Sequence, residues 1–260
     1  MGRAKEFGWL KAMSAPAETG PGHRLVVCLG ASIVHGSVSF NFVDLLRERL
    51  GPKGFRFVNA GVNGDLAYNV LQRLEQVIRT QPDFVVVLVG TNDVMSTLSE
   101  RAESRYMRRK GLPQRPTLDW YRENLEAIVN DLRQRTKARI ALSTLPPLGE
   151  DLTSRPNQTI ARYNDAIRGV GEKYHAVLLP VYESQAEYLR SAHREPGRAF
   201  EGSGLMWEAI LRHSILRQSF GKISEKNGFL LTIEGIHMNS RGGTMIADQV
   251  EAFIPSPLPV

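Results

Sequence analysis

The chain has 260 residues, of which 42% are hydrophobic and 23% are charged. This length and composition are typical of one globular domain, or at most two, with a sizeable apolar core. Cys28 is the single cysteine, which excludes an intrachain disulfide, and no run of about 18 apolar residues predicts a transmembrane helix. The formal net charge of +6 is compatible with anionic substrates or acidic surfaces, but no motif indicates a nucleic-acid partner.

Residues 1–22 are expected to form a flexible leader. The apolar run at residues 7–10 ends at Lys11, so it is too short for the apolar region of a secretory signal peptide. Met13 is a second candidate start. We therefore expect residues 23–260 to form a single domain with a cytoplasmic location.

Five apolar runs rich in β-branched residues are expected to form strands. They lie at residues 24–29, 55–60, 84–89, 138–144 and 176–181. Segments between and after them repeat apolar residues with a period near 3.6, as amphipathic helices do, with faces that include Phe42, Leu74, Ile128, Ile160 and Ile246. Alternating strands and helices predict a mostly parallel sheet with helices on both faces.

Two segments are longer than plain connections, at about residues 95–118 and 183–231, and we expect them to be lid-like insertions. The first is basic between residues 101 and 115. This charge indicates either a solvated surface or a positively charged rim for an anionic or polar substrate. The second insertion contains a helical pattern at residues 205–220.

Polar residues and glycines follow the first three strand-like runs, and a histidine precedes the last helix. Ser32 follows the first run, Gly64 the second and Asn92 the third, whereas His237 lies near the C-terminus. Because loops that follow parallel strands emerge at one edge of the sheet, we expect the first three to converge. Acyl transfer needs a nucleophile, a base, an acid that orients the base, and donors to the oxyanion.

The candidate nucleophile is Ser32, the candidate base is His237, and the candidate orienting acid is Glu234. The candidate oxyanion donors are the backbone N–H groups of Ser32 and Gly64 and the side-chain amide of Asn92. Each residue has a plainer interpretation. Ser32 is also a typical helix N-cap, His237 a typical structural histidine, and Gly64 and Asn92 typical turn residues.

In their order and context, these residues resemble the four sequence blocks of the SGNH hydrolase superfamily, also called GDSL-type esterases and lipases. Gly90-Thr91-Asn92-Asp93 matches the third block completely. The resemblance runs from about residue 24 to residue 253. It implies a flavodoxin-like three-layer α/β/α sandwich with a parallel sheet, a Ser-His-acid triad, and ester hydrolysis without a metal or cofactor.

Two residues depart from the family pattern. Ala31 stands where the first block usually has aspartate, so the turn before Ser32 must be supported differently. Glu234 stands where the family usually has an aspartate, three residues before His237, and the longer side chain must fold back to reach the imidazole. A Ser-His dyad held by a backbone carbonyl is the alternative, and a binding module that has lost activity is another.

We therefore predict a serine hydrolase that cleaves short-chain acyl or acetyl esters through an acyl-enzyme, with no metal and no cofactor. His35 and Asp93 are expected to line the substrate pocket. A lysophospholipase, a thioesterase and an acyltransferase are alternatives for the same site. The sequence lacks both phosphate-binding glycine patterns and the Gly-x-Ser-x-Gly pattern of α/β-hydrolases. A small-molecule ester is the expected partner, and the oligomeric state is left open.

Overall fold

In this computed structural model, residues 23–192, 200 and 220–255 are described. Five strands form one sheet in the order β2-β1-β3-β4-β5, and every neighbouring pair is parallel. The strands are β1 (Arg24–Gly30), β2 (Phe55–Gly61), β3 (Phe84–Leu88), β4 (Arg139–Ser143) and β5 (Val177–Leu179). The five predicted strands and the parallel sheet are therefore confirmed, with ends that differ by one or two residues.

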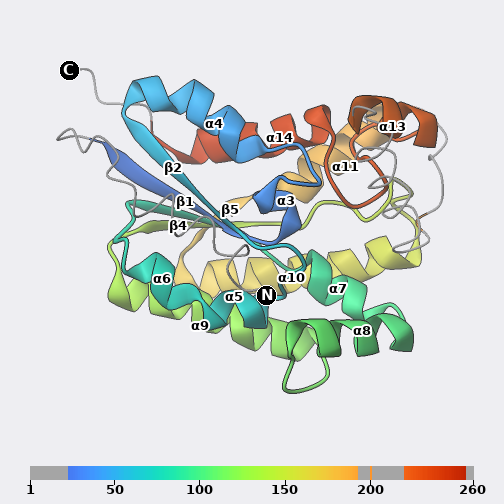
Figure 1. The fold of residues 1–260 in the computed structure, drawn as a ribbon, viewed down its shortest axis with the longest axis horizontal. Coiled ribbons are helices and arrows are strands. Elements are labelled where there is room, and N and C mark those ends of the chain that lie inside the picture. The colour runs from blue at the N-terminus through green and yellow to red at the C-terminus, as the bar shows by residue number, and fades with distance from the viewer. Residues whose placement is uncertain (1–22, 193–199, 201–219, 256–260) are drawn as a thin grey trace, which may run out of the picture.

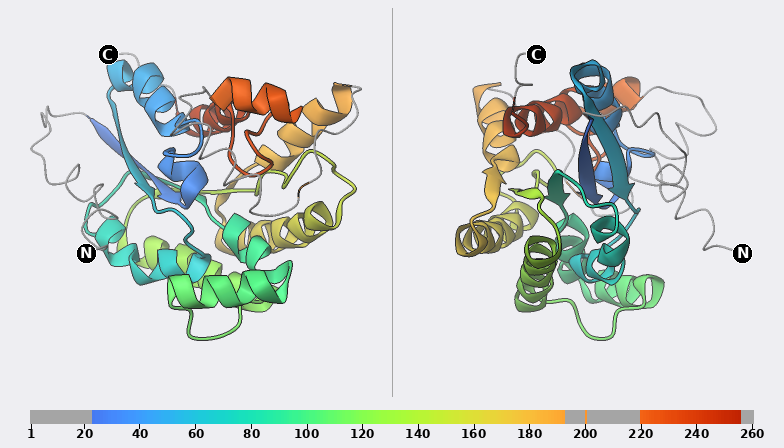
Figure 2. Two further views of the ribbon diagram at one scale, coloured as in Figure 1. Left: turned by 45° about the vertical axis from the view of Figure 1, so that its right-hand side comes forward. Right: turned by 90° about the vertical axis from the view of Figure 1, so that its left-hand side faces the viewer.

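Helices cover both faces of the sheet, which gives three layers (Figures 1 and 2). The first layer contains α4 (Phe42–Leu50), α11 (Val181–Ser191) and α14 (Ser240–Phe253), and α14 contacts both of the others. In the opposite layer, α9 (Leu118–Arg135) contacts α5 (Ala67–Gln72) and α10 (Arg155–Tyr174). The strand order is that of flavodoxin-like folds, in which ligands bind beyond the carboxyl ends of the strands. The predicted α/β/α sandwich is confirmed.

The helix pattern after β2 is interrupted at Arg73. The sequence periodicity continues across this position, but the structure has two short helices, α5 and α6 (Leu74–Ile78). Arg73 is buried, and its guanidinium donates to Asp65 and to the carbonyl of Gly30. Arg73 points into the protein at this break. Its side chain therefore links the helical layer to the end of β1.

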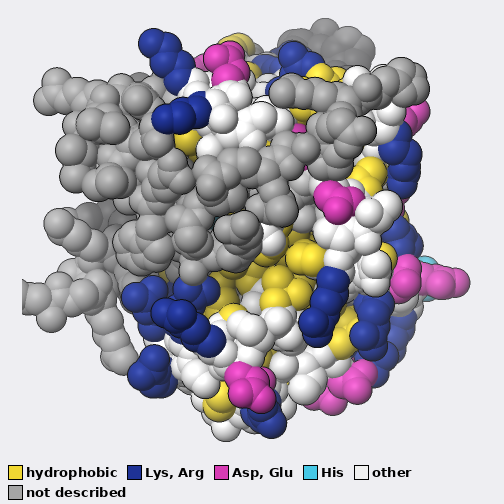
Figure 3. Space-filling view, turned by 90° about the vertical axis from the view of Figure 1, so that its right-hand side faces the viewer, with side chains coloured by type: hydrophobic (Ala, Val, Ile, Leu, Met, Phe, Trp, Pro, Cys, Tyr) yellow, Lys and Arg dark blue, Asp and Glu magenta, His cyan; other side chains and the backbone are white. Residues whose placement is uncertain are grey.

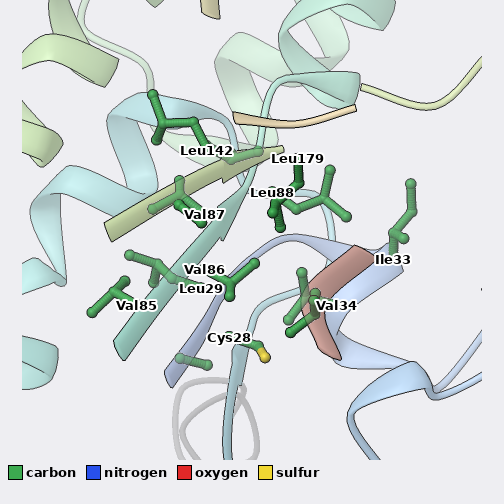
Figure 4. Close-up of a cluster of buried hydrophobic side chains, with 14 of the residues drawn as sticks. Cys28, Leu29, Ile33, Val34, Val85, Val86, Val87, Leu88, Leu142 and Leu179 are labelled. Atoms are coloured by element: carbon green, nitrogen blue, oxygen red, sulfur yellow. The ribbon is translucent and has the colours of Figure 1, made fainter. Parts of the chain in front are cut away.

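The turn after β1 lies on the apolar core. Every residue of β3 is buried, and Ile33 and Val34 of the short helix α3 (Ser32–His35) pack into the same cluster (Figure 4). A Cβ atom at Gly30 would lie only 2.1 Å from the carbonyl oxygen of Leu88. Glycine is therefore required at this position of β1, immediately before the turn.

Both predicted insertions contain helices. The first includes the end of α7 (Thr91–Thr97), all of α8 (Glu100–Lys110) and the beginning of α9, and α8 packs against α7. The second includes most of α11 and also α13 (Phe220–Asn227), but nearly all of the expected helix at residues 205–220 lies outside the described residues. No described helix is both long enough and apolar enough to cross a bilayer.

Candidate active site

Ser32 is the first residue of α3, directly beyond the carboxyl end of β1. Its side chain does not cap the helix, because Ala31 occupies the N-cap position and no side-chain cap hydrogen bond is present. Instead, the Ser32 Oγ atom lies 2.9 Å from Nε2 of His237. The Ser32 side chain is therefore not the cap of α3, and its hydroxyl faces the imidazole of His237.

His237 lies between the serine and a buried carboxyl group. Its Nδ1 atom is hydrogen-bonded to Oε1 of Glu234, which also accepts the backbone N–H of His237 at 3.2 Å. Only 1% of the Glu234 surface is exposed, and 4% of that of His237. Gly235 has a φ of +92°, a left-handed conformation that lets the chain fold back within one turn. The longer glutamate therefore reaches the imidazole, and the partner of Nδ1 is this carboxyl rather than a backbone carbonyl.

Glu150 holds the segment that leads to Glu234. The carboxyl group of Glu150 accepts hydrogen bonds from the backbone N–H groups of Leu230, Leu231 and Thr232 and from the Thr232 hydroxyl. Beyond His237, Met238 accepts the backbone N–H of Phe40 and donates to the hydroxyl of Ser39. The loop that carries the histidine is thus tied to the loop that follows Ser32.

Asn92 lies in the first turn of α7, and it lines the same cavity as Ser32 and His237. Its Nδ2 donates to the carbonyl of Asp65 at 2.9 Å, and its Oδ1 accepts the hydroxyl of Tyr106 at 2.8 Å. The second N–H of the amide has no acceptor among the described residues. The backbone N–H groups of Ser32 and Gly64 likewise have no acceptor there. Three donors are thus available to a developing oxyanion.

The segment before α5 is held by a buried ion-pair network centred on Asp65. One carboxyl oxygen accepts Nε of Arg73 at 2.8 Å, and the other lies 3.0 Å from Nζ of Lys110. Lys110 also donates to the carbonyl of Asn63, and its Cε would lie 2.9 Å from a Cβ at Gly64. Because Arg73 also binds the carbonyl of Gly30, this network supports the turn at Ala31, which lacks the family aspartate.

A cavity of about 270 Å³ opens beside the Ser32–His237 pair. On the face that Figure 3 shows, apolar side chains form the floor of a hollow with basic side chains on either side. Helix α8 contributes four residues to the cavity lining. The described lining consists of Ser32, Val38, Asn63, Gly64, Asn92, Met95, Arg105, Tyr106, Arg109, Lys110, Ile236 and His237.

The structure does not bring His35 and Asp93 into this lining. His35 is half-buried at the end of α3, where its backbone lies against Gly61, and burial lowers the pKa of its imidazole. The Asp93 carboxyl faces α5, and both of its oxygens accept the N–H of Ala67 at 3.2 Å. Burial raises the pKa of Asp93 well above its usual value. These two positions are therefore explained by packing beneath the site.

Glu150, Tyr106 and Lys110 were not predicted from the sequence as site residues. None of them stands at the end of a strand or in a sequence pattern that marks a function. The basic character of residues 101–115 was the one signal near Tyr106 and Lys110, and such a stretch is more often a solvated surface. The described residues contain no group of His, Cys, Asp or Glu side chains suited to hold a metal ion.

The chain is similar to known proteins in sequence and in fold. A family model of the GDSL-like lipase/acylhydrolase family matches residues 28–242. The chain is 22% identical over 183 residues to an acetylxylan esterase of Geobacillus stearothermophilus, with 68% of this chain and 76% of the relative covered. It is 24% identical over 188 residues to a multidomain esterase of Ruminococcus flavefaciens, covering 66% of this chain but only 22% of that protein.

Solved structures with the same fold include two acetylxylan esterases. One gives a TM-score of 0.66 at 20% identity, with 89% of this chain and all of the other covered. The other, from Geobacillus stearothermophilus, gives a TM-score of 0.61 at 18% identity, with 91% of this chain and 95% of the other covered. At such identities these structures show likeness of fold, whereas the family model spans most of the chain, including Ser32, Gly64, Asn92 and His237. The chain belongs to the GDSL-like lipase/acylhydrolase family and is a carboxylic ester hydrolase.

Proposed function

We propose that the protein hydrolyses small esters, with short acyl or acetyl groups, through a Ser32–His237–Glu234 triad and an acyl-enzyme. The observation that carries this proposal is the 2.9 Å distance between Ser32 Oγ and His237 Nε2. The histidine accepts the serine proton as Oγ attacks the ester carbonyl, and it later gives a proton to the leaving alcohol. Water then attacks the acyl-enzyme with the same assistance.

Glu234 orients the base and stabilises the imidazolium that forms. The backbone N–H of His237 holds the carboxyl oxygen of Glu234 in place, and this oxygen binds Nδ1, so the ring cannot turn away from Ser32 without losing its contact with Glu234. The tetrahedral oxyanion is stabilised by the N–H groups of Ser32 and Gly64 and by Asn92. No step in this scheme draws on a metal or a cofactor.

The names of the relatives suggest acetylated sugars as substrates, and the small cavity supports a short acyl group. Acyl transfer to an alcohol, cleavage of thioesters and cleavage of lysophospholipids use the same triad chemistry. A panel of esters of increasing acyl length, with acetylated xylan and a lysophospholipid included, separates these alternatives. A kcat/KM that is highest for the acetyl ester and falls as the acyl chain lengthens is the expected result.

The decisive experiment is the hydrolysis of p-nitrophenyl acetate by Ser32→Ala. We expect kcat to fall by about 10⁴- to 10⁶-fold, since loss of one triad member removes the activated nucleophile. Labelling by a fluorophosphonate probe should be lost in parallel. Ser104→Ala, at an exposed position of α8, is the matched control and should retain both signals. A folded Ser32→Ala protein with undiminished turnover would refute the proposal.

Glu234→Gln tests the acid separately. The amide keeps the size of the side chain but stabilises the wrong imidazole tautomer, so we expect kcat to fall by about 10²- to 10⁴-fold. An unchanged kcat would instead favour a Ser-His dyad, and an inactive binding module would show no Ser32-dependent labelling in the wild-type protein.

A further inference from the structure

We propose that this site selects esters that carry an anionic group, bound by Arg105 and Arg109 of helix α8 beside the scissile bond. The inference rests on the ester-hydrolase function proposed above and names the class of ester that the site takes. A guanidinium group presents paired N–H donors that match the two oxygens of a carboxylate. A carboxylate is therefore the anionic group that this proposal addresses.

The charge of the cavity lining is one-sided. Arg105, Arg109 and Lys110 all line the cavity, and no Asp or Glu is among its described lining residues. In Figure 3, basic side chains flank the apolar floor of the hollow on this face. A cleft lined by one sign of charge attracts ligands of the opposite sign and raises their local concentration.

The three cations differ in what they do for the fold. Lys110 is occupied by Asp65 and the carbonyl of Asn63, so it serves the loop at Gly64. Arg109 is exposed and makes no ion pair with any residue that the structure describes. The guanidinium of Arg105 lies over the ring of Tyr106, 5.6 Å from its centroid. Arg109 therefore carries charge that a ligand would meet, and Arg105 adds to the positive charge of the same lining.

The spacing of the arginines on α8 is unfavourable for the helix itself. Arg101, Arg105 and Arg109 follow one another at intervals of four residues, which places like charges side by side on one face and destabilises a helix. Attraction to the helix dipole accounts for cations in the last turn, including Arg109. Arg105 lies in the middle of the helix, away from the last turn, and an anion bound near Arg105 and Arg109 would relieve their repulsion.

This charge acts close to the reaction. Tyr106 lies between the two arginines in sequence, and its hydroxyl donates to Oδ1 of Asn92 at 2.8 Å. Burial raises the pKa of the Tyr106 hydroxyl to about 12, and both arginines oppose this rise electrostatically. Their positive potential thus reaches the hydroxyl that contacts the oxyanion amide. Both arginines line the same cavity of about 270 Å³ as Ser32 and His237.

Two pairs of substrates test the proposal and locate the anion. p-Acetoxybenzoate and its methyl ester differ by a carboxylate on the alcohol part. Mono-p-nitrophenyl glutarate and p-nitrophenyl pentanoate differ by a carboxylate on the acyl part. The measured quantity is the ratio of kcat/KM for the anionic and neutral member of each pair, which cancels changes that affect all esters alike.

Arg105→Gln and Arg109→Gln should each lower this ratio by about five-fold for at least one pair, as expected for a partly exposed ion pair. Arg108→Gln removes an exposed charge of the same helix that does not line the cavity, and it should leave the ratio at its wild-type value. The wild-type ratio should also fall as ionic strength rises from about 0.01 M to about 1 M, because the Debye length shrinks from about 30 Å to about 3 Å.

The outcomes separate this inference from the function on which it rests. Hydrolysis of the neutral esters that depends on Ser32 supports the function, whatever the ratios are. Ratios that stay at the wild-type value in both Arg105→Gln and Arg109→Gln, or that fall equally in Arg108→Gln, would overturn the anion preference. If no ester is turned over, the anion preference is decided by the affinities of p-acetoxybenzoate and its methyl ester for Ser32→Ala, measured by calorimetry. Tighter binding of the anion, lost in the additional Arg109→Gln variant, supports the inference, and equal affinities reject it.

Discussion

The amide of Asn92 is fixed from two directions. Asp65 accepts one of its N–H groups, and Tyr106 donates to its oxygen, so the remaining N–H points to one place. Preorganised donors stabilise an oxyanion because they need no reorientation during the reaction. Tyr106 is therefore a positioning residue that acts through Asn92.

We expect Tyr106→Phe to lower kcat by about three- to ten-fold, the equivalent of one ordinary hydrogen bond, with a smaller change in KM. The ring that contacts Arg105 is kept in this variant. Tyr68→Phe is the matched control, since the ring of Tyr68 stacks on Trp120 at 5.1 Å outside the cavity. A change in KM alone, measured with p-nitrophenyl acetate, would argue against a role in transition-state stabilisation.

Asp93 provides a test of pH dependence. Burial raises the pKa of this carboxyl in the folded protein, so folding takes up a proton between the unfolded and folded pKa values. The stability that the neutral carboxyl contributes is present below the unfolded pKa and is lost as pH rises through the folded pKa. Relative to Asp93→Asn, which does not titrate, the wild-type free energy of unfolding should therefore fall with rising pH.

Urea unfolding of both proteins at a series of pH values above about 4 measures this difference. A difference for Asp93→Asn that does not vary with pH would contradict the raised pKa.

At the scale of elements, the loop that carries Glu234 and His237 has little regular structure of its own. A single antiparallel bridge joins Thr232 and Met238, and the carboxyl of Glu150 gathers three successive backbone N–H groups. This carboxyl comes from the connection between β4 and α10, so the position of His237 depends on a distant part of the chain.

We expect Glu150→Gln to destabilise the protein by about 1.5–3 kcal/mol, because its NH₂ group would face N–H donors that now bind a carboxyl. The activity at a temperature where the variant is folded should also fall, as His237 loses its fixed position. Glu172→Gln, at an exposed position of α10, should change neither quantity. Measurement combines the urea midpoint with kcat for p-nitrophenyl acetate, and a variant as stable and active as wild type would contradict this role.

Features that depend on neighbouring residues were predictable from the sequence, whereas features that depend on contacts between distant elements were not. Strands, amphipathic helices and the residues that follow each strand were predictable, because period and glycine position are local features. The break at Arg73 was not, because its cause is the buried Asp65, which periodicity does not reveal. Glu150 and Tyr106 were missed for the same reason. Each reaches the site through packing between elements, and no neighbouring residue marks it.

At the scale of the molecule, one apolar cluster extends from Val26 in β1 to Phe253 in α14 and Ile254 just beyond it. We therefore predict that the described part of the chain unfolds as a single cooperative domain. Loss of esterase activity and loss of far-ultraviolet circular dichroism should have the same urea midpoint. An earlier loss of activity would show instead that the histidine loop opens before the sheet unfolds.

The contact between Ser32 and His237 joins residues that are 205 positions apart. During synthesis, Ser32 leaves the ribosome long before His237 does. In the proposed mechanism, Ser32 is activated only when the loop before α14 brings His237 to it. The mechanism therefore withholds reactivity from incomplete chains, and the first appearance of esterase activity would mark the end of folding rather than its beginning.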